Sequence, residues 1–295
     1  MMSSRPAPRG DSQPDEGDYR VVAEPPGGRV LAAAKVAAEV VLWSEVAVRR
    51  RTARLRRRQR AVPDLVPPTA VLQRRADWQA AVVHARSRGL PLHRDRPKNW
   101  DAIGAVGAIL GHAPPSEWPA LRVMDAGSAR YSPILPWLRL YGLGDAPGVL
   151  IGLNIEFGRE RVYDGVRFNH GDVTRTRLPS GSLDAITCMS VIEHGLPIPA
   201  FLAESVRLLR PGGLLTISTD YDRQPPRTEG LSAYGSPVRI FGPDDIRALV
   251  AEADRVGLRL VGELDNEDLT NPERPVHWKR VDLDYTFILL TFERQ

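Results

Sequence analysis

The chain has very little cysteine, with one residue, Cys188, among 295. A single thiol excludes both a disulfide framework and a zinc site built from several thiolates. It fits a protein of the reducing cytoplasm, which is where we expect this chain to act. We expect no secretory leader, because residues 1–28 are polar and rich in proline, glycine and charged side chains.

Lysine is also scarce, since only three of the 40 basic residues are lysines. Eight arginines and no acid stand between Arg49 and Arg60, and without them the formal net charge of +4 becomes −4. The basic charge is therefore local. A uniformly basic nucleic-acid-binding face is not indicated, and we expect no nucleic-acid partner.

Long apolar runs without charge are absent as well. The most apolar stretch, residues 29–48, is broken by Lys35, Glu39 and Glu45, so we expect no transmembrane helix. Its good helix formers predict one long helix over residues 29–60 that ends in the arginine run. Three interpretations of that run stay open: a solvated helix end, peripheral contact with an anionic membrane, and a phosphate-backbone contact.

Prolines at positions 63, 67 and 68 mark a boundary in the chain. We predict a disordered tail over residues 1–28, a basic amphipathic helical arm over 29–62, and one domain over 63–295. Residues 63–120 of this domain are expected to form a helical lead-in, with helices over 70–89 and 100–110. The arm is expected to be an appendage, because eight arginines cannot be buried without partners.

From residue 121 onward, β-rich runs alternate with helical runs. This alternation predicts an α/β fold with a mostly parallel sheet and helices on both faces. Strands are expected over residues 121–125, 149–155, 166–170, 184–191, 214–220, 259–264 and 283–292. Helices are expected over residues 133–141, 198–209 and 243–256, and the last of them opens with a proline and two acids.

Small or polar residues follow each of the first four predicted strands. In an open α/β sheet the carboxyl ends of parallel strands share one edge, and ligands bind there. The pattern predicts a nucleoside site with backbone N–H groups at a glycine turn, a ribose contact, an adenine contact and a group near the reacting atom. In that order, these roles fall to Asp125, Gly127 and Ser128; Asn154 or Glu156; Asp172, with Val173 over the ring; and Ser190.

These motifs resemble those of the class I S-adenosylmethionine (SAM)-dependent methyltransferases. The resemblance covers residues 121–294 and is closest to the small-molecule, methyltransferase-11/25-like branch. It rests on a GD-x(5)-LP-x(3)-LD-x-I block followed by SVIEH over residues 171–194, and on RLLRPGGLLTIST over 207–219. The chain departs from the family at Ala129 and Tyr131, where glycines are usual, and at Asn154, where an acid is usual.

The resemblance implies a Rossmann-like sheet of seven strands whose last strand is antiparallel, with SAM as cofactor. It also implies in-line methyl transfer to an oxygen or nitrogen atom of a small molecule. The loops over residues 220–240 and 265–279 follow the fifth and sixth strands, so we expect them to cover the cofactor. Candidate catalytic bases are His194, Asp220 and His277, and candidate pocket residues are Glu193, Tyr221, Tyr234, Arg239 and Trp278. No spacing of acids and histidines indicates a metal site.

Plainer interpretations stay open beside these. Asp125 could cap the following helix and Asp172 could be a turn acid. Glu193, His194, Tyr234 and Trp278 could serve only to pack their loops, and Cys188 is expected to be a buried core thiol rather than a nucleophile. For the whole chain, the alternative is a non-catalytic SAM-fold protein that docks on a partner protein through residues 29–60.

Overall fold

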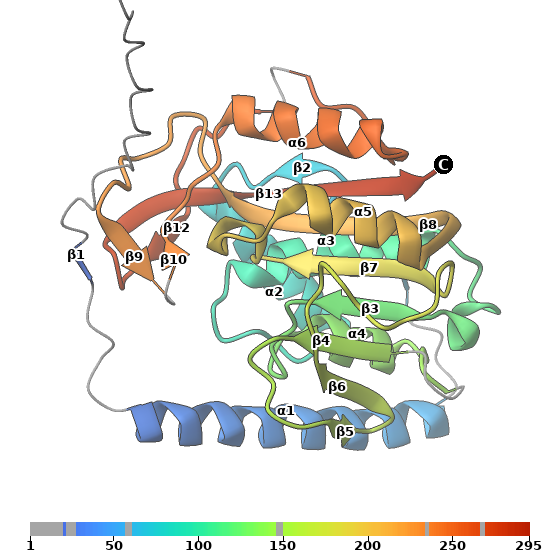
Figure 1. Cartoon of the computed structure of the whole chain (residues 1–295). Helices are drawn as coiled ribbons and strands as arrows, with labels where there is room; N and C mark the ends of the chain where they lie inside the picture. The colour runs from blue at the N-terminus through green and yellow to red at the C-terminus, as the bar shows by residue number, and fades with distance from the viewer. Residues whose placement is uncertain (1–19, 22–27, 57–60, 146–149, 234–235, 266–268) are drawn as a thin grey trace, which may run out of the picture.

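A mixed sheet forms the centre of the protein. The computed structural model describes residues 20–21, 28–56, 61–145, 150–233, 236–265 and 269–295 (Figure 1). Seven strands of the sheet follow the order β6-β4-β3-β7-β8-β13-β11. The first five run parallel to their neighbours, and β13 is antiparallel to both β8 and β11. In chain order these strands are β3 (Val123–Ala126), β4 (Leu150–Asn154), β6 (Val166–His170), β7 (Leu183–Met189), β8 (Leu209–Tyr221), β11 (Leu258–Leu260) and β13 (Leu283–Arg294).

Helices cover both faces of this sheet (Figure 1). One hydrophobic cluster joins the first face of the sheet to α1 (Gly28–Arg56), α2 (Arg75–Ser87), α3 (Lys98–Gly111) and α4 (Ile134–Leu140). A second cluster joins the other face to α5 (Ile198–Leu208) and α6 (Pro243–Arg255). Alternate residues of one strand serve the two clusters, as Val123 and Met124 of β3 do, because successive side chains of a strand point to opposite faces.

The predicted α/β fold with a last antiparallel strand is confirmed, but the sheet has ten described strands rather than seven. The additional strands are β5 (Arg161–Tyr163) beside β6, and β2 (Ala70–Val71) and β12 (Val276–Trp278) beside β13. Residues 70–71 therefore extend the sheet instead of starting a helix. A separate small sheet contains β1 (Arg20–Val21), β9 (Leu231–Ala233) and β10 (Ser236–Pro237). Most of the predicted disordered tail lies outside the described residues.

The connection between β4 and β6 lacks a helix. Parallel neighbours are usually joined by a crossover helix that covers the sheet. Here the chain instead passes through β5, which pairs antiparallel with β6 at the edge of the sheet. The apolar face of β5 and β6 therefore needs a cover from elsewhere in the sequence.

The helix α1 provides this cover. The indole of Trp43 stacks on Tyr163 of β5 at 5.7 Å between ring centroids and meets Phe168 of β6 edge-on at 5.7 Å. Its Nε1 donates a hydrogen bond to the carbonyl oxygen of Arg130 at 3.0 Å. Trp43 is only 4% exposed and Val46 is fully buried. The expectation that the helix is an appendage is therefore wrong, because its apolar side is part of the main core.

Ion pairs fix α1 at both ends of this contact. Glu39 accepts a hydrogen bond from the Tyr163 hydroxyl at 3.2 Å and lies 3.6 Å from the Arg130 guanidinium. One turn beyond Val46, Arg50 pairs with Asp164 at 2.5 Å and with Asp145 at 2.8 Å. At least this arginine of the run therefore has acidic partners in the body of the protein.

Replacing Trp43 tests this role of α1. We expect Trp43→Ala to lower the free energy of unfolding by about 3–5 kcal/mol, because it leaves a cavity over β5 and β6. Val41→Ala on the same helix, where the side chain is 66% exposed, should change it by less than about 0.5 kcal/mol. Urea denaturation measures both, and equal effects of the two substitutions would contradict the packing described here.

Candidate active site

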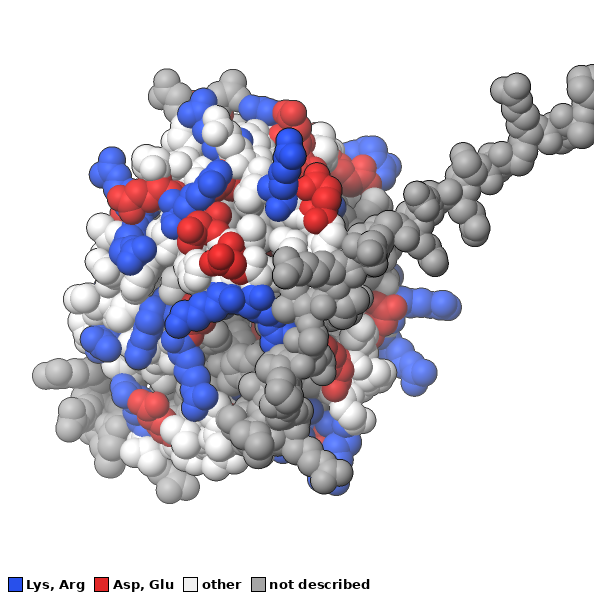
Figure 2. All heavy atoms as spheres, turned by 90° about the vertical axis from the view of Figure 1, so that its left-hand side faces the viewer, with Lys and Arg blue, Asp and Glu red and all other residues white. Residues whose placement is uncertain are grey.

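The carboxyl ends of β3, β4, β6, β7 and β8 meet at one edge of the sheet, which faces the viewer in Figure 2. Acidic and basic side chains are intermingled on this face (Figure 2). At the end of β3, Asp125 is buried and accepts a hydrogen bond from Thr187 of β7 at 2.6 Å. Burial raises the pKa of Asp125 to about 6. Its carboxyl group therefore links two strands within the protein and does not cap the following helix.

The turn after β3 depends on a glycine. Gly127 has a φ of +71°, and an added Cβ would lie 2.4 Å from a methyl group of Val191. Both the backbone conformation and the close approach of Val191 therefore require glycine here. Asn154, at the end of β4, donates hydrogen bonds to the carbonyl oxygens of Gly127 and Ser128 at 3.2 and 3.0 Å. Its amide thus holds the turn in place, and Glu156 is the exposed carboxylate beside it.

The end of β6 presents Asp172. Its Oδ1 accepts hydrogen bonds from the backbone N–H and the hydroxyl of Thr174 at 2.8 and 2.7 Å, and these bonds lower its pKa. The side chain is exposed, while Val173 beside it is buried in the core. Asp172 is therefore a turn acid that keeps its second oxygen, Oδ2, for another donor.

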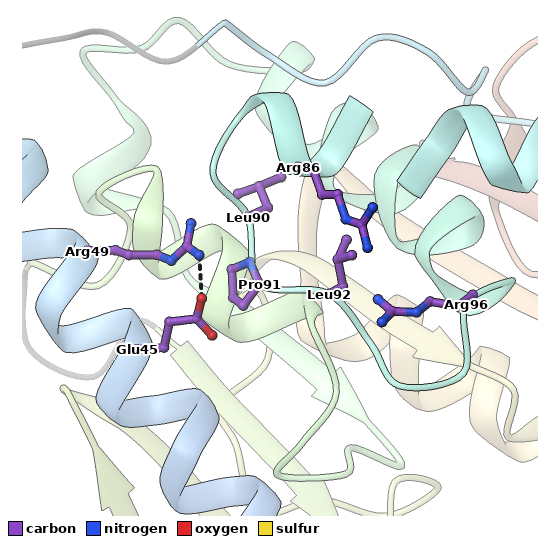
Figure 3. Close-up of a pocket in the computed structure, with 7 residues that line it drawn as sticks. All are labelled: Glu45, Arg49, Arg86, Leu90, Pro91, Leu92 and Arg96. Carbon is purple, nitrogen blue, oxygen red and sulfur yellow. Dashed lines mark hydrogen bonds and ion pairs between the residues drawn. The ribbon is translucent and has the colours of Figure 1, made fainter. Parts of the chain in front are cut away.

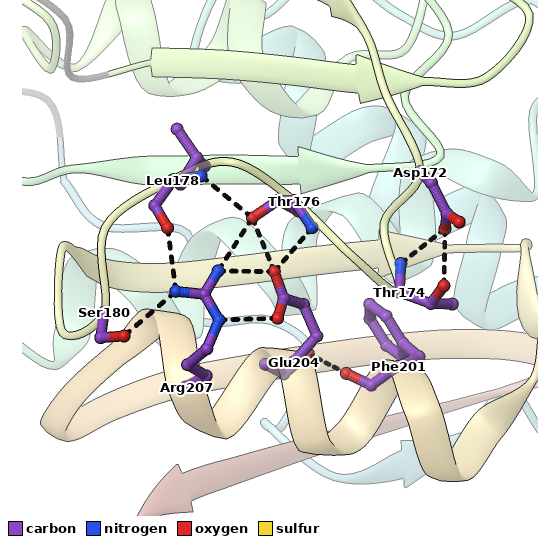
Figure 4. A network of polar contacts seen from close by, with 9 residues as sticks. Asp172, Thr174, Thr176, Leu178, Ser180, Phe201, Glu204 and Arg207 are labelled. Atoms are coloured by element: carbon purple, nitrogen blue, oxygen red, sulfur yellow. Dashed lines mark hydrogen bonds and ion pairs between the residues drawn. The ribbon is translucent and has the colours of Figure 1, made fainter.

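An ion pair ties the loop that follows Asp172 to α5 (Figure 4). Glu204 of α5 accepts hydrogen bonds from the backbone N–H and the hydroxyl of Thr176, both at 2.7 Å. Arg207 binds both oxygens of Glu204 at 2.8 and 2.7 Å and donates to the carbonyl oxygen of Leu178 at 2.9 Å. Two anchored positions in this loop hold Asp172 at a defined place on the strand edge.

A cluster of buried charges lies where β7 and β8 end. Lys98, in the first turn of α3, donates a hydrogen bond to Ser190 Oγ at 2.6 Å, and Ser190 has a φ of +54°. Asp101 accepts from Ser218 at 2.8 Å, and Glu193 accepts from Thr219 at 3.0 Å. Asp220 completes the cluster and is hydrogen-bonded to the hydroxyl of Tyr285. Three carboxyl groups, each at most 4% exposed, thus share one ammonium group.

Burial shifts the pKa values of the three carboxyl groups upward. Burial raises the pKa of Asp101 to about 6 and the pKa of Glu193 to about 7. Burial and the neighbouring Glu193 raise the pKa of Asp220 well above its ordinary value. Burial alone would lower the pKa of Lys98, but Asp101, Asp220 and Glu193 raise it. The cluster therefore holds protons at neutral pH, and the Oε1 atom of Glu193 is buried with no hydrogen-bond partner among the described residues.

The residues predicted to bind or deprotonate the methyl acceptor do not all lie at this edge of the sheet. The ring of His194 lies 6.5 Å from that of Trp278, and burial and Lys98 lower its pKa. Tyr221 is a core residue, because it is fully buried and its hydroxyl donates to the carbonyl oxygen of Leu269. Arg239 is exposed and pairs with Asp245 at the start of α6. His277 neighbours Trp278 on β12 but is exposed and 2.9 Å from Asp284.

Two further predictions concern single residues. Tyr234 lies outside the described residues. Cys188 is fully buried, and burial raises the pKa of its thiol well above its ordinary value. The prediction that Cys188 is a buried core thiol is therefore confirmed. Within the described part of the chain, no three acids, histidines or cysteines are placed to share a metal ion.

The sequence did not reveal the cluster residues Lys98, Asp101 and Tyr285. They lie far from the motifs, on α3 and at the start of β13, and only the folded sheet brings them to the same edge. One signal was available for Lys98, because it is one of three lysines in a chain that otherwise uses arginine. A compact ammonium group with a flexible stem suits a crowded buried site better than a planar guanidinium does.

Two surface cavities lie away from the glycine turn. One, of about 340 Å³, is lined by side chains of α1, of the end of α2 and of the segment after it, among them Arg49, Arg86 and Arg96 (Figure 3). The other, of about 550 Å³, is formed where Arg274 binds both oxygens of the buried Asp222 at 2.6 and 3.1 Å. This second contact joins the loops that follow β8 and β11.

The pH dependence of stability tests the protonation of Glu193. Its folded-state pKa of about 7 exceeds the ordinary value of 4.5, so its contribution to stability is complete below pH 4.5 and is lost as the pH rises through about 7. We expect the unfolding free energy of Glu193→Gln, relative to the unmodified protein, to rise by on the order of 1–3 kcal/mol from about pH 5 to about pH 8. Denaturation at several pH values measures this difference. A constant or falling difference would contradict the assignment.

Comparison with known proteins finds similarity to methyltransferases. Residues 126–217 match the model of a family described as "Methyltransferase domain". A curated protein of Mycolicibacterium smegmatis, named "Probable S-adenosylmethionine-dependent methyltransferase", is 39% identical over 57 residues. That segment is 19% of this chain and 22% of the relative, so the chain matches about a fifth of the relative's length.

Solved structures of methyltransferases are also similar to the chain. A SAM-dependent methyltransferase of Mesorhizobium loti is 16% identical with a TM-score of 0.43, and the match covers 67% of this chain and 98% of that one. A Burkholderia thailandensis N1-methyltransferase with bound S-adenosylhomocysteine is 16% identical with a TM-score of 0.46, covering 75% and 87%. The segment that matches the methyltransferase-domain model, residues 126–217, contains the strands β4, β6 and β7 and the sequence motifs at their carboxyl ends.

Proposed function

We propose that this chain is an enzyme that transfers the methyl group of SAM to an oxygen or nitrogen atom of a small-molecule acceptor. The observation that carries the proposal is the alignment of the Gly127 turn, Glu156 and Asp172 at the ends of the neighbouring strands β3, β4 and β6. SAM supplies a methyl group on a sulfonium sulfur, which is reactive without further activation. The protein has to hold donor and acceptor in line, and such positioning provides most of the acceleration.

The strand ends fit the adenosine part of SAM. Glu156 is an exposed carboxylate that can accept hydrogen bonds from the ribose hydroxyls. Asp172 presents Oδ2 to an adenine amino group while Thr174 occupies Oδ1. The amide of Asn154 keeps the Gly127 turn at the distance that a close-lying ligand needs. Of the two residues that the sequence offered for the ribose contact, the proposal thus keeps Glu156 and gives Asn154 a supporting role at the turn.

Glu193 is the best candidate for the base that accepts a proton from the acceptor. A hydroxyl or a neutral N–H amine attacks the methyl carbon, S-adenosylhomocysteine leaves, and the methylated oxygen or nitrogen gives up its proton to a base. The Oε1 atom of Glu193 lacks a hydrogen-bond partner among the described residues, and a pKa of about 7 suits proton transfer at neutral pH. His194, with its lowered pKa, is neutral and is the second candidate. Burial and the neighbouring Glu193 raise the pKa of Asp220 well above its ordinary value, and its carboxyl group is hydrogen-bonded to Tyr285, so we assign it to positioning rather than to proton transfer.

Adenine recognition can be tested at Asp172 without disturbing its turn. Asp172→Asn keeps one oxygen for Thr174 but replaces the other by an amide N–H group, which repels the adenine amino group. We expect the affinity for SAM, measured by calorimetry, to fall by about tenfold, which is the loss of one hydrogen bond. Thr174→Val removes only the hydroxyl at this turn and should change the affinity by less than about threefold. Unchanged binding in Asp172→Asn would mean that adenine is recognised elsewhere.

The role of Glu193 can be tested once an acceptor is found by screening phenols and amines for S-adenosylhomocysteine formation. We expect kcat/KM to rise with pH through about 7, because the base must be ionised. Glu193→Gln should lower kcat by about 10²-fold or more while the Kd for SAM stays the same. If the chain binds SAM but none of the screened acceptors yields S-adenosylhomocysteine, the result would instead favour the non-catalytic alternative.

A further inference from the structure

The helix α1 is unusual because charged side chains lie on its inward side and valines lie on its outward side. Besides Trp43 and Val46, its inward side carries Glu39 and Arg50, whose charges are paired with residues of the body. Its outward side carries valines: Val36, Val40, Val41 and Val48 are between 43% and 66% exposed. A helix on a protein surface normally exposes its charges and buries its valines.

The exposed strip of α1 has no charge along its described length. The exposed positions between residues 36 and 48 are Val36, Ala37, Val40, Val41, Ser44 and Val48. At 1.5 Å of rise per residue, this valine strip is about 18 Å long. In Figure 1, α1 runs along the outer edge of the protein beside β5 and β6, with no described element beyond it. Contiguous apolar surface of this kind marks an interaction site.

Positive charge follows the valine strip directly. The helix continues to Arg56, and residues 51–60 add six arginines and no acid. On the flank of α1, the cavity in Figure 3 brings Arg49 near Arg86 and Arg96. Arg49 is paired with Glu45, whereas no ion pair joins Arg86 or Arg96 to the described residues. The valine strip is therefore followed in the sequence by a run of arginines, and further arginines line the cavity on the flank of α1.

We infer that α1 docks this protein on the surface of an anionic lipid bilayer. The valine strip would enter the interface between headgroups and acyl chains, and the arginines would contact the lipid phosphates. None of the described helices has the length and apolar character needed to cross a bilayer, so α1 lies in the plane of the surface. The positive charge of the arginine run favours an anionic membrane as the partner. Docking of a second copy of the chain through α1 would instead bring like charges together.

Sedimentation with lipid vesicles tests this inference on the full chain. We expect binding to vesicles of equal parts phosphatidylcholine and phosphatidylglycerol, weak binding to phosphatidylcholine alone, and a steep loss of binding as salt is added. Val40→Asp combined with Val41→Asp should lower the vesicle affinity by about tenfold or more. Val83→Asp on α2 is the matched control, because Val83 is 65% exposed and Val41 is 66% exposed, and it should leave binding unchanged.

Several results would overturn the inference. These are full-length protein that ignores anionic vesicles at low salt, equal binding to both kinds of vesicle, and equal effects of the α1 and α2 substitutions. A dimer in light scattering that the α1 substitutions dissociate would assign the strip to a second copy instead. Circular dichroism and SAM titration of each variant confirm that fold and cofactor site are intact, so the result is independent of the proposed function.

Discussion

A single ammonium group holds the carboxyl edge of the sheet together. Lys98 faces three buried carboxyl groups, and no arrangement of one cation can neutralise three anions. Burial raises the pKa values of Asp101 and Glu193, and the site therefore retains protons more readily than exposed carboxyl groups would. Removing water from such groups is costly unless each is paired or hydrogen-bonded. The hydrogen bond from Ser218 of β8 to Asp101 fixes α3 against the strands, and the one from Thr219 holds Glu193.

A second constraint is the missing crossover helix between β4 and β6. Without it, Tyr163 and Phe168 would face water, and a segment far away in the sequence covers them instead. The helix α1 therefore carries apolar residues on both its inward and its outward side. It needs apolar side chains inward to cover β5 and β6, and it also carries valines outward. Glu39 and Arg50 of α1 lie within the contact, where Arg130 and Asp164 pair with them.

The order of the sheet and the residues at its edge could be predicted because each depends on local sequence. Turn residues and β-rich runs place Asp125, Asn154 and Asp172 at strand ends without knowledge of the fold. The packing of α1 could not be predicted, because Trp43 alone among many alanines and valines gives no sign of its partners. Nor could the cluster be found, since Lys98 and Tyr285 are separated by nearly the whole domain. Tyr221 was misplaced because β8 continues through this residue, one position beyond the predicted strand, and buries its side chain in the core.

The distance along the chain between α1 and its partners has a consequence for synthesis. Glu39 and Tyr163, which share a hydrogen bond, are 124 residues apart. At 5–20 residues per second, on the order of ten seconds pass between the emergence of the helix from the ribosome and that of the strands it covers. Throughout that interval Trp43 and the valines on both sides of α1 are exposed together. The nascent chain is then a basic, apolar helix on a growing tether, and it depends on chaperones or on fast completion to avoid aggregation.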